Sequence, residues 1–107
     1  MATIIRGNTD SLIEALKSAL DAYEAAYPGA EAKLYRQNSA SIRIKVTDRR
    51  FEGMSKSRRH DHVWNFLAQR VPQDTLAEIS QVLAIAPAEL QMSFANFEFD
   101  DPRPSRL

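Results

Sequence analysis

The sequence has no cysteine, three scattered glycines and no long apolar run. Without cysteine, the chain's own residues cannot supply disulfides, thiolate nucleophiles or thiolate ligands for a metal cluster. Three isolated glycines cannot form a glycine-rich phosphate-binding loop. The longest apolar run, at residues 82–87, is far shorter than the roughly 20 residues that span a membrane. No apolar segment of the signal-peptide type opens the chain, so we expect a cytoplasmic protein without membrane contact.

Length and charge narrow the interpretation further. The 107 residues predict one domain over 1–99, followed by a flexible C-terminal tail at 100–107. Net charge is zero, but residues 36–59 carry eight Lys or Arg against two Asp or Glu. A basic segment between acidic ends is typical of a surface that contacts an acidic partner or phosphates. The alternative is that Arg43 and Lys45 are ordinary solvent-facing strand residues and the others are solvated loop charges.

Apolar periodicity predicts the first half of the fold. Residues 8–27 have helical spacing, and Pro28-Gly29 ends the helix. Residues 31–37 and 41–48 alternate as two strands of an antiparallel hairpin. On the second strand Ile42, Ile44 and Val46 face the core, whereas Arg43, Lys45 and Thr47 face solvent.

The second half predicts two helices and a strand. Ser55 or Ser57 caps a helix that runs to about residue 70, with an apolar stripe of His60, Val63, Trp64 and Leu67. A third helix starts at Asp74 or Thr75 and ends before Pro87. Residues 90–99 are predicted to form a last strand. Its apolar residues switch from even to odd positions between Phe94 and Phe97, which either a bulge or burial on both faces would explain. The prediction is an α+β fold of order α-β-β-α-α-β, a three-stranded sheet with helices packed on one face.

One segment resembles a family signature. Phe51-x-Gly53, Arg59-His60, and Val63 followed by the aromatic Trp64 match the spacing of BolA-like proteins, which share a class II KH-like fold. The resemblance covers about residues 10–99. It implies a non-enzymatic protein that pairs with a monothiol glutaredoxin, often sharing a [2Fe–2S] cluster, and in some members a link to transcription and DNA binding.

The sequence departs from that family at its cluster ligands. The resemblance implies a His or Cys in the loop between the first two strands, and a His near the start of the last strand. Residues 37–41 and 88–94 contain neither imidazole nor thiol. We therefore expect no cofactor, and sharing of a [2Fe–2S] cluster through the usual residues is disfavoured. A glutaredoxin-like protein partner remains an expectation.

The two histidines do not indicate a metal or a catalytic site. His60 is predicted to be partly buried, to bond the loop before its helix and to stack on Trp64. His62 lies about 200° further round the helix and is expected to be exposed, so the two cannot chelate one ion. No serine has a nucleophile-elbow context, and the only adjacent carboxylates, Asp100 and Asp101, lie in the predicted tail. We therefore expect no enzyme.

The leading hypothesis is an adaptor whose basic loop and helix start dock an acidic protein. Phe51 and Gly53 shape that loop, and glycine supplies a conformation that other residues adopt only with strain. The alternative is weak, salt-sensitive binding of DNA or RNA by the same surface, with Tyr35 as a stacking platform. The scattered glycines exclude the GxxG clamp of a true KH domain. The predicted contact residues are Arg49, Arg50, Lys56, Arg58 and Arg59.

Overall fold

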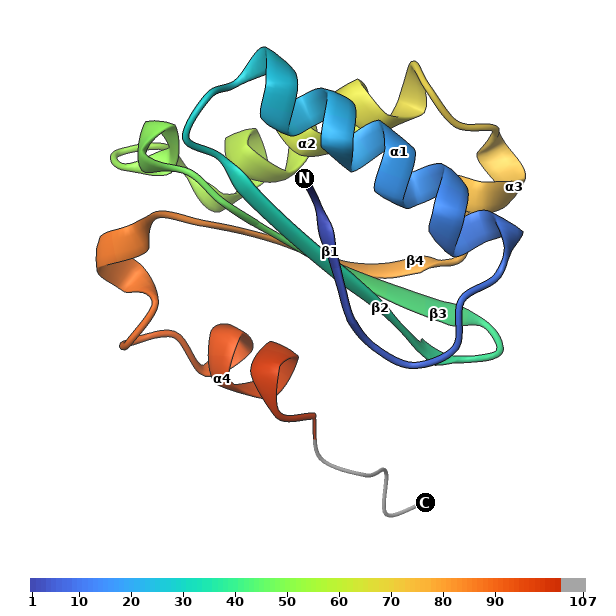
Figure 1. Ribbon diagram of the computed structural model, residues 1–107. Helices are drawn as coiled ribbons and strands as arrows, with labels where there is room; N and C mark the ends of the chain where they lie inside the picture. Colours follow the sequence, from blue (N-terminus) through green and yellow to red (C-terminus); the bar gives the residue numbers. More distant parts are fainter. Residues whose placement is uncertain (103–107) are drawn as a thin grey trace.

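A four-stranded mixed sheet lies between two unequal helical layers in the computed structural model, which describes residues 1–102 (Figure 1). The strands, in their order across the sheet, are β1 (Thr3–Arg6), β2 (Glu31–Asn38), β3 (Ser41–Thr47) and β4 (Ile79–Ile85). The helices are α1 (Ser11–Ala26), α2 (Lys56–Ala68), α3 (Gln73–Leu76) and α4 (Phe94–Asp100), with two 3-10 turns, η1 (Arg49–Phe51) and η2 (Pro87–Glu89). Helices α1, α2 and α3 cover one face of the sheet, and α4 lies on the other (Figure 1).

The predicted first helix and hairpin are confirmed. Asp10 caps α1 by accepting hydrogen bonds of 3.0 Å from the backbone N–H groups of Leu12 and Ile13. Strands β2 and β3 pair antiparallel, with Leu34 opposite Ile44. Strand β1, which the sequence analysis did not predict, adds to β2 in parallel. Strand β4 pairs in parallel with β3 and forms the other edge of the sheet.

The face of the sheet beneath α1 and α2 holds the apolar core. The side chains of Leu16 and Leu20 on α1 and of Ile44 on β3 are fully buried there. From α2, Val63 and Leu67 join the same cluster. Burying apolar side chains contributes about 1.5–3 kcal/mol each, so this face supplies most of the packing free energy.

The prediction for the C-terminal third is wrong in its elements. Residues 79–85 form β4 rather than the end of a third helix, and α3 is a single turn. Residues 90–99, predicted as a strand, lie mostly in α4 and the turn before it. The sheet therefore has four strands, not three, and the order is β-α-β-β-α-α-β-α. The class α+β is correct. On β4, Val82 and Ala84 face the apolar core, whereas Leu83 and Ile85 face the other side of the sheet. Because both faces carry apolar side chains, the segment lacks the polar–apolar alternation of a strand with one buried face.

The second face of the sheet is covered, contrary to prediction. Phe99 of α4 is fully buried and packs edge-on against Tyr35, with ring centroids 4.9 Å apart. Lys45, expected in solvent, is 4% exposed, and its Nζ donates to Asn96 Oδ1 (2.6 Å) and Asp100 Oδ1 (2.8 Å). Arg43 donates to the Tyr35 hydroxyl at 3.2 Å. The parity change that suggested a bulge is thus the signature of a helix.

Two remaining expectations concern the chain ends and membranes. Asp100 ends α4, so the predicted tail begins inside a helix, and its part at 103–107 lies outside the described residues. Within residues 1–102, no helix combines the length and the apolar character needed to cross a membrane.

Candidate functional site

The loop from β3 to α2 presents the predicted basic residues. Asp48 caps η1 by accepting from the Arg50 N–H at 2.9 Å, and Phe51, 1% exposed, anchors the turn in the core. Gly53 has a φ of 80°, the left-handed conformation anticipated for it. Ser55, one of the two predicted caps, accepts from the Arg58 N–H at 3.3 Å and starts α2. The two helix caps, the buried Phe51 ring and the turn at Gly53 together fix the backbone that carries the basic side chains.

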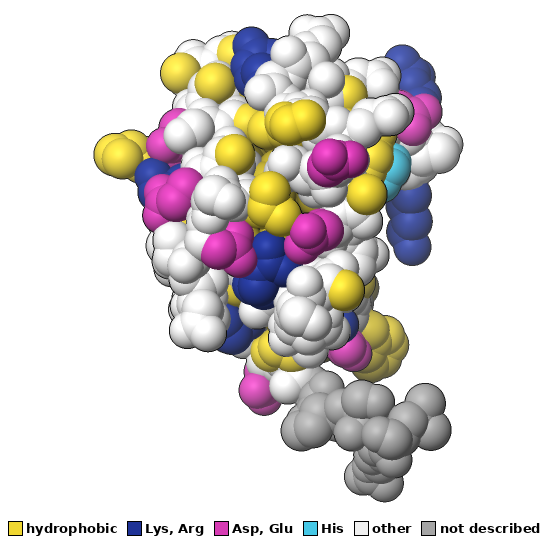
Figure 2. Space-filling model, turned by 90° about the vertical axis from the view of Figure 1, so that its right-hand side faces the viewer, with side chains coloured by type: hydrophobic (Ala, Val, Ile, Leu, Met, Phe, Trp, Pro, Cys, Tyr) yellow, Lys and Arg dark blue, Asp and Glu magenta, His cyan; other side chains and the backbone are white. Residues whose placement is uncertain are grey.

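Three of the five predicted contact residues are exposed cations without an ion pair among residues 1–102: Arg49, Lys56 and Arg58. Arg50 differs, because it contacts Asp48 at 3.2 Å and lies 5.2 Å from the centre of the Tyr27 ring. The face of the molecule in Figure 2 instead mixes acidic, basic and apolar side chains at close range. We name Arg49, Lys56 and Arg58 the exposed cations.

Arg59 differs from the other four predicted contact residues, because it is largely buried and bonded within the fold. It is 8% exposed and donates two hydrogen bonds to Glu89, from Nη1 to Oε1 at 2.6 Å and from Nη2 to Oε2 at 2.9 Å. Its guanidinium also donates to the Met54 carbonyl (3.0 Å) and the Ala84 carbonyl (3.3 Å). Such bidentate, charge-assisted bonds are the strong ones. The hydrogen bonds from Arg59, then that from the Ala86 N–H, lower the pKa of Glu89 from 4.5 to about 2.

The two histidines exchange their predicted roles. The side chain of His60 is 48% exposed and stacks on Trp64, with centroids 5.6 Å apart and ring planes 16° from parallel. The stack was predicted, but the partial burial was not correct. His62, expected in solvent, places Nε2 3.0 Å from the Tyr23 hydroxyl. The buried stripe of α2 keeps the predicted Val63 and Leu67 but contains Arg59 in place of His60, and His62 lies on the inward side beside it.

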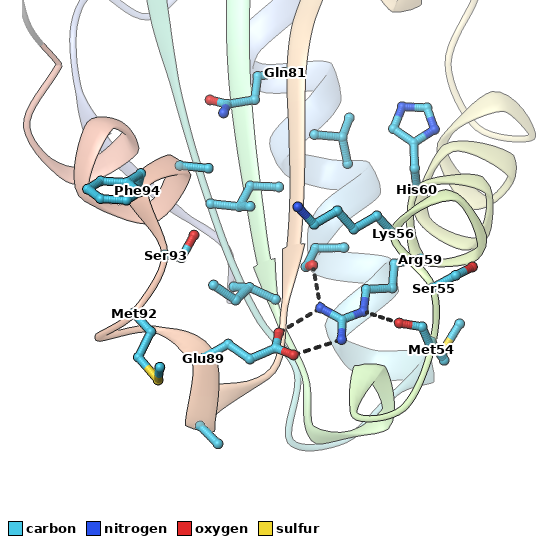
Figure 3. A pocket seen from close by; sticks show the side chains of 16 residues that line it. Met54, Ser55, Lys56, Arg59, His60, Gln81, Glu89, Met92, Ser93 and Phe94 are labelled. Atoms are coloured by element: carbon cyan, nitrogen blue, oxygen red, sulfur yellow. Dashed lines mark hydrogen bonds and ion pairs between the residues drawn. The ribbon is translucent and has the colours of Figure 1, made fainter.

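An open groove lies beside the exposed cations. It has a volume of about 920 Å³ and runs along β4, between the start of α2 and the segment 88–95. Figure 3 shows Lys56 and His60 on one side of β4, and Ser93 and Phe94 on the other. Arg59 and Glu89 bond to each other across one end of it. We call this space the edge groove.

The α4 side of the edge groove carries exposed apolar side chains. Met92 is 83% exposed and Phe94 88% exposed, and both line the groove. Phe97, one helical turn from Phe94, is 50% exposed. Exposed aromatic side chains of this size in one place mark contact surfaces. The sequence analysis missed them because it placed residues 90–99 in a strand; Ser93, which accepts from the Asn96 N–H at 3.1 Å, was the available helix-cap signal.

No metal centre is apparent among the side chains of residues 1–102, where no three His, Asp or Glu groups converge to hold an ion. Of the two segments in which the resemblance implies cluster ligands, residues 37–41 span the turn between β2 and β3, and residues 88–94 run from η2 to the first residue of α4.

Comparisons with known proteins do not assign the chain to a family. No protein-family model matches the sequence, and no curated protein or solved structure shows significant similarity to it.

Proposed function

We propose that this chain is a BolA-like adaptor without catalytic activity of its own, which binds an acidic protein partner through the exposed cations. The observation that carries the proposal is the contrast between Arg49, Lys56 and Arg58, which lack ion pairs within residues 1–102, and the paired Arg36, Lys45 and Arg59 elsewhere. Exposed charge of one sign steers an oppositely charged partner and aligns it on docking.

The resemblance to BolA-like proteins is supported by the position of the motif. The consecutive elements α1-β2-β3-α2-α3-β4 follow the order expected for that family, with β1 and α4 as additions. Phe51 and Gly53 occupy the turn between β3 and α2, where the family has its signature. The last strand begins at Ile79, and the residues around its start contain no imidazole or thiol. A monothiol glutaredoxin is therefore the first partner to test. We expect it to bind this chain without the chain supplying ligands to a shared [2Fe–2S] cluster.

The experiment titrates the purified protein into a [2Fe–2S]-loaded monothiol glutaredoxin and follows both binding and visible circular dichroism. We expect a complex that the double variant Arg49→Glu with Arg58→Glu weakens by at least about tenfold, because two attractions become repulsions. Arg70→Glu is the control for one charge reversal, since it makes the same replacement as either half of the double variant on an exposed residue after the other end of α2. Equal weakening by the control and the double variant would refute the surface assignment.

Nucleic-acid binding is the second candidate, favoured by Lys56 and Arg58 in the first turn of α2, where backbone N–H groups also attract phosphate. Tyr35, expected to offer a stacking face, is only 1% exposed. Binding to the surface would then depend on charge alone and fall steeply with salt. A single-stranded DNA and an RNA oligonucleotide, titrated at two salt concentrations against the same variants, separate this candidate from the adaptor role.

A further inference from the structure

The free edge of β4 is partly closed by side chains. In a parallel pair, successive residues of a strand direct their backbone groups alternately toward and away from the neighbouring strand. The Ile85 carbonyl accepts from Asp48 N–H of the chain after β3 at 3.1 Å, so Ile85 is directed inward. Ala84 and Ala86 are therefore directed outward. The Ala84 carbonyl accepts from Arg59 (3.3 Å), and the Ala86 N–H donates to Glu89 (3.0 Å).

The same alternation leaves the backbone N–H and carbonyl of Val82 on the free edge of β4. Both groups are directed away from β3, and among residues 1–102 neither group has a hydrogen-bond partner. Strand edges are normally protected because unpaired backbone groups template pairing with another chain. The Arg59–Glu89 pair thus protects the C-terminal part of the edge only. The unprotected part lies in the edge groove, which Val82 lines.

The two walls of the edge groove differ in chemistry. On the α2 side are Lys56 and His60, with Lys56 free of an ion pair within the described residues. On the α4 side are Leu83, Met92 and Phe94. Side chains of a strand alternate between the two faces of a sheet, so a strand added beside β4 would meet one wall with every second side chain.

We propose that the β4 edge binds an extended peptide segment of a partner protein as a fifth strand, with acidic side chains toward Lys56 and apolar side chains toward Met92 and Phe94. Backbone bonds to Val82 supply affinity that is independent of sequence, and the two unlike walls select alternating acidic and apolar residues. This inference rests on the proposed adaptor function and specifies the kind of segment that the partner contributes.

Charge favours this occupant over a second copy of the chain. Two copies joined edge to edge about a two-fold axis at Val82 would place both α2 walls on the same side of the joined sheet. The two Lys56 side chains would then add like charges to one side of the joint, whereas an acidic strand neutralises the one Lys56 that is present.

The probe is a fluorescein-labelled heptapeptide that alternates valine and glutamate, titrated against the full chain and followed by fluorescence anisotropy. We expect saturable binding that two control peptides lose: one with lysine in place of glutamate, and one with the same residues grouped instead of alternating. N-methylation of alternate backbone amides along one edge of the peptide should abolish binding, and methylation along the other edge should preserve it. Equal affinity of both methylated peptides would overturn strand addition.

A substitution in the protein tests the same bond from the other side. Val82→Pro removes the outward N–H while leaving the β3–β4 ladder intact, because proline is tolerated where an edge strand's N–H faces solvent. We expect roughly tenfold weaker peptide binding, the loss of one well-placed hydrogen bond and of close approach. The matched control Val82→Ala shortens the side chain but keeps the N–H, and should retain affinity within about threefold. If Val82→Pro does not fold, the methylated peptides decide alone.

The remaining outcomes separate the competing occupants. A dimer of the unliganded chain in light scattering, dissociated by Val82→Pro, would replace the peptide with a second copy. An oligonucleotide that competes with the heptapeptide for the groove would likewise overturn the proposal. Arg49→Glu with Arg58→Glu lies outside the groove lining and should leave heptapeptide binding within about threefold. If this double variant loses glutaredoxin binding but the parent protein does not bind the heptapeptide, the β4 edge is rejected and the basic docking surface is kept. If the parent binds the heptapeptide but the double variant still binds glutaredoxin, the basic docking surface is rejected and the edge is kept.

Discussion

On the α1–α2 face of the sheet, β3 presents Ile42, Ile44 and Val46, all fully buried among other apolar side chains. On the α4 face the same strand presents Arg43 and Lys45. The first face gains free energy by removing apolar area from water. The second buries a cation, which costs free energy unless its hydrogen bonds are made, and Asn96 and Asp100 make them.

This difference implies that the two layers do not contribute equally to stability. The α4 layer consists of one seven-residue helix, too short to be stable without the sheet. Its attachment depends on Phe99 and on a few polar contacts, including two hydrogen bonds from Arg6 to the Phe99 and Asp100 carbonyls. We therefore expect α4 to open locally at a lower free energy than the rest of the domain. Substitutions on the two faces test this inequality.

The largest effect is expected at Ile44. Its replacement by alanine leaves a cavity in the apolar core beneath α1 and α2, where Ile44 is fully buried. The free energy of unfolding should fall by about 4 kcal/mol, within the usual range for Ile→Ala in a core. Urea denaturation followed by circular dichroism measures it. A loss below about 1 kcal/mol would place the stability of the domain elsewhere.

Phe99→Ala should have a smaller and local effect. Removing the ring takes away the contacts with Tyr35 and with Lys45, whose Nζ lies 5.1 Å from the ring centre. Since α4 can detach, global stability should fall by about 1–3 kcal/mol, less than for Phe→Ala in a closed core. Hydrogen exchange should show loss of protection in residues 97–101 while the β3 amides stay protected. Loss of protection at β3 would show that the two layers unfold as one.

The same comparison explains how much of the fold could be predicted. The helix α1 and the β2–β3 hairpin face one apolar core, so their periods of 3.6 and 2 are clean in the sequence. Strand β4 packs on both sides, and its apolar run, without a clear alternation, reads equally well as a buried helix segment. The error then displaced the last strand into residues 90–99.

The candidate site was predictable in part for a related reason. The exposed cations were found because charge is visible in composition. The burial of Arg59 was not, because it depends on Glu89, which is thirty residues away in η2, a 3-10 turn that was not predicted. Likewise, Arg59 rather than His60 completes the buried stripe of α2 with Val63 and Leu67, and the roles of His60 and His62 are exchanged. Long-range partners, rather than local propensity, decided each of these cases.

The smallest expected effect concerns Glu89, which bonds to Arg59 of α2 beside the β4 edge. Because Arg59 lowers its folded-state pKa to about 2 from an ordinary 4.5, the ionised carboxylate stabilises the fold above about pH 4.5. That contribution is lost as pH falls through about 2. In Glu89→Gln the side chain does not titrate, so the free energy of unfolding should fall at pH 6 by about 1 kcal/mol at most, since Glu89 is 42% exposed.

The difference between the parent and Glu89→Gln should stay constant from pH 7 to about 5 and shrink steadily below about 4.5. Urea denaturation at several pH values measures it. Glu98→Gln is the control, because the Glu98 carboxylate lies 3.8 Å from Arg43 and is 53% exposed. A difference in the free energy of unfolding that stays constant down to pH 2 would contradict this prediction. It would mean that the Arg59–Glu89 pair acts through hydrogen-bond geometry that glutamine cannot reproduce, and not through the charge. The contact beside the β4 edge would then depend on hydrogen-bond geometry and not on an acid-sensitive charge.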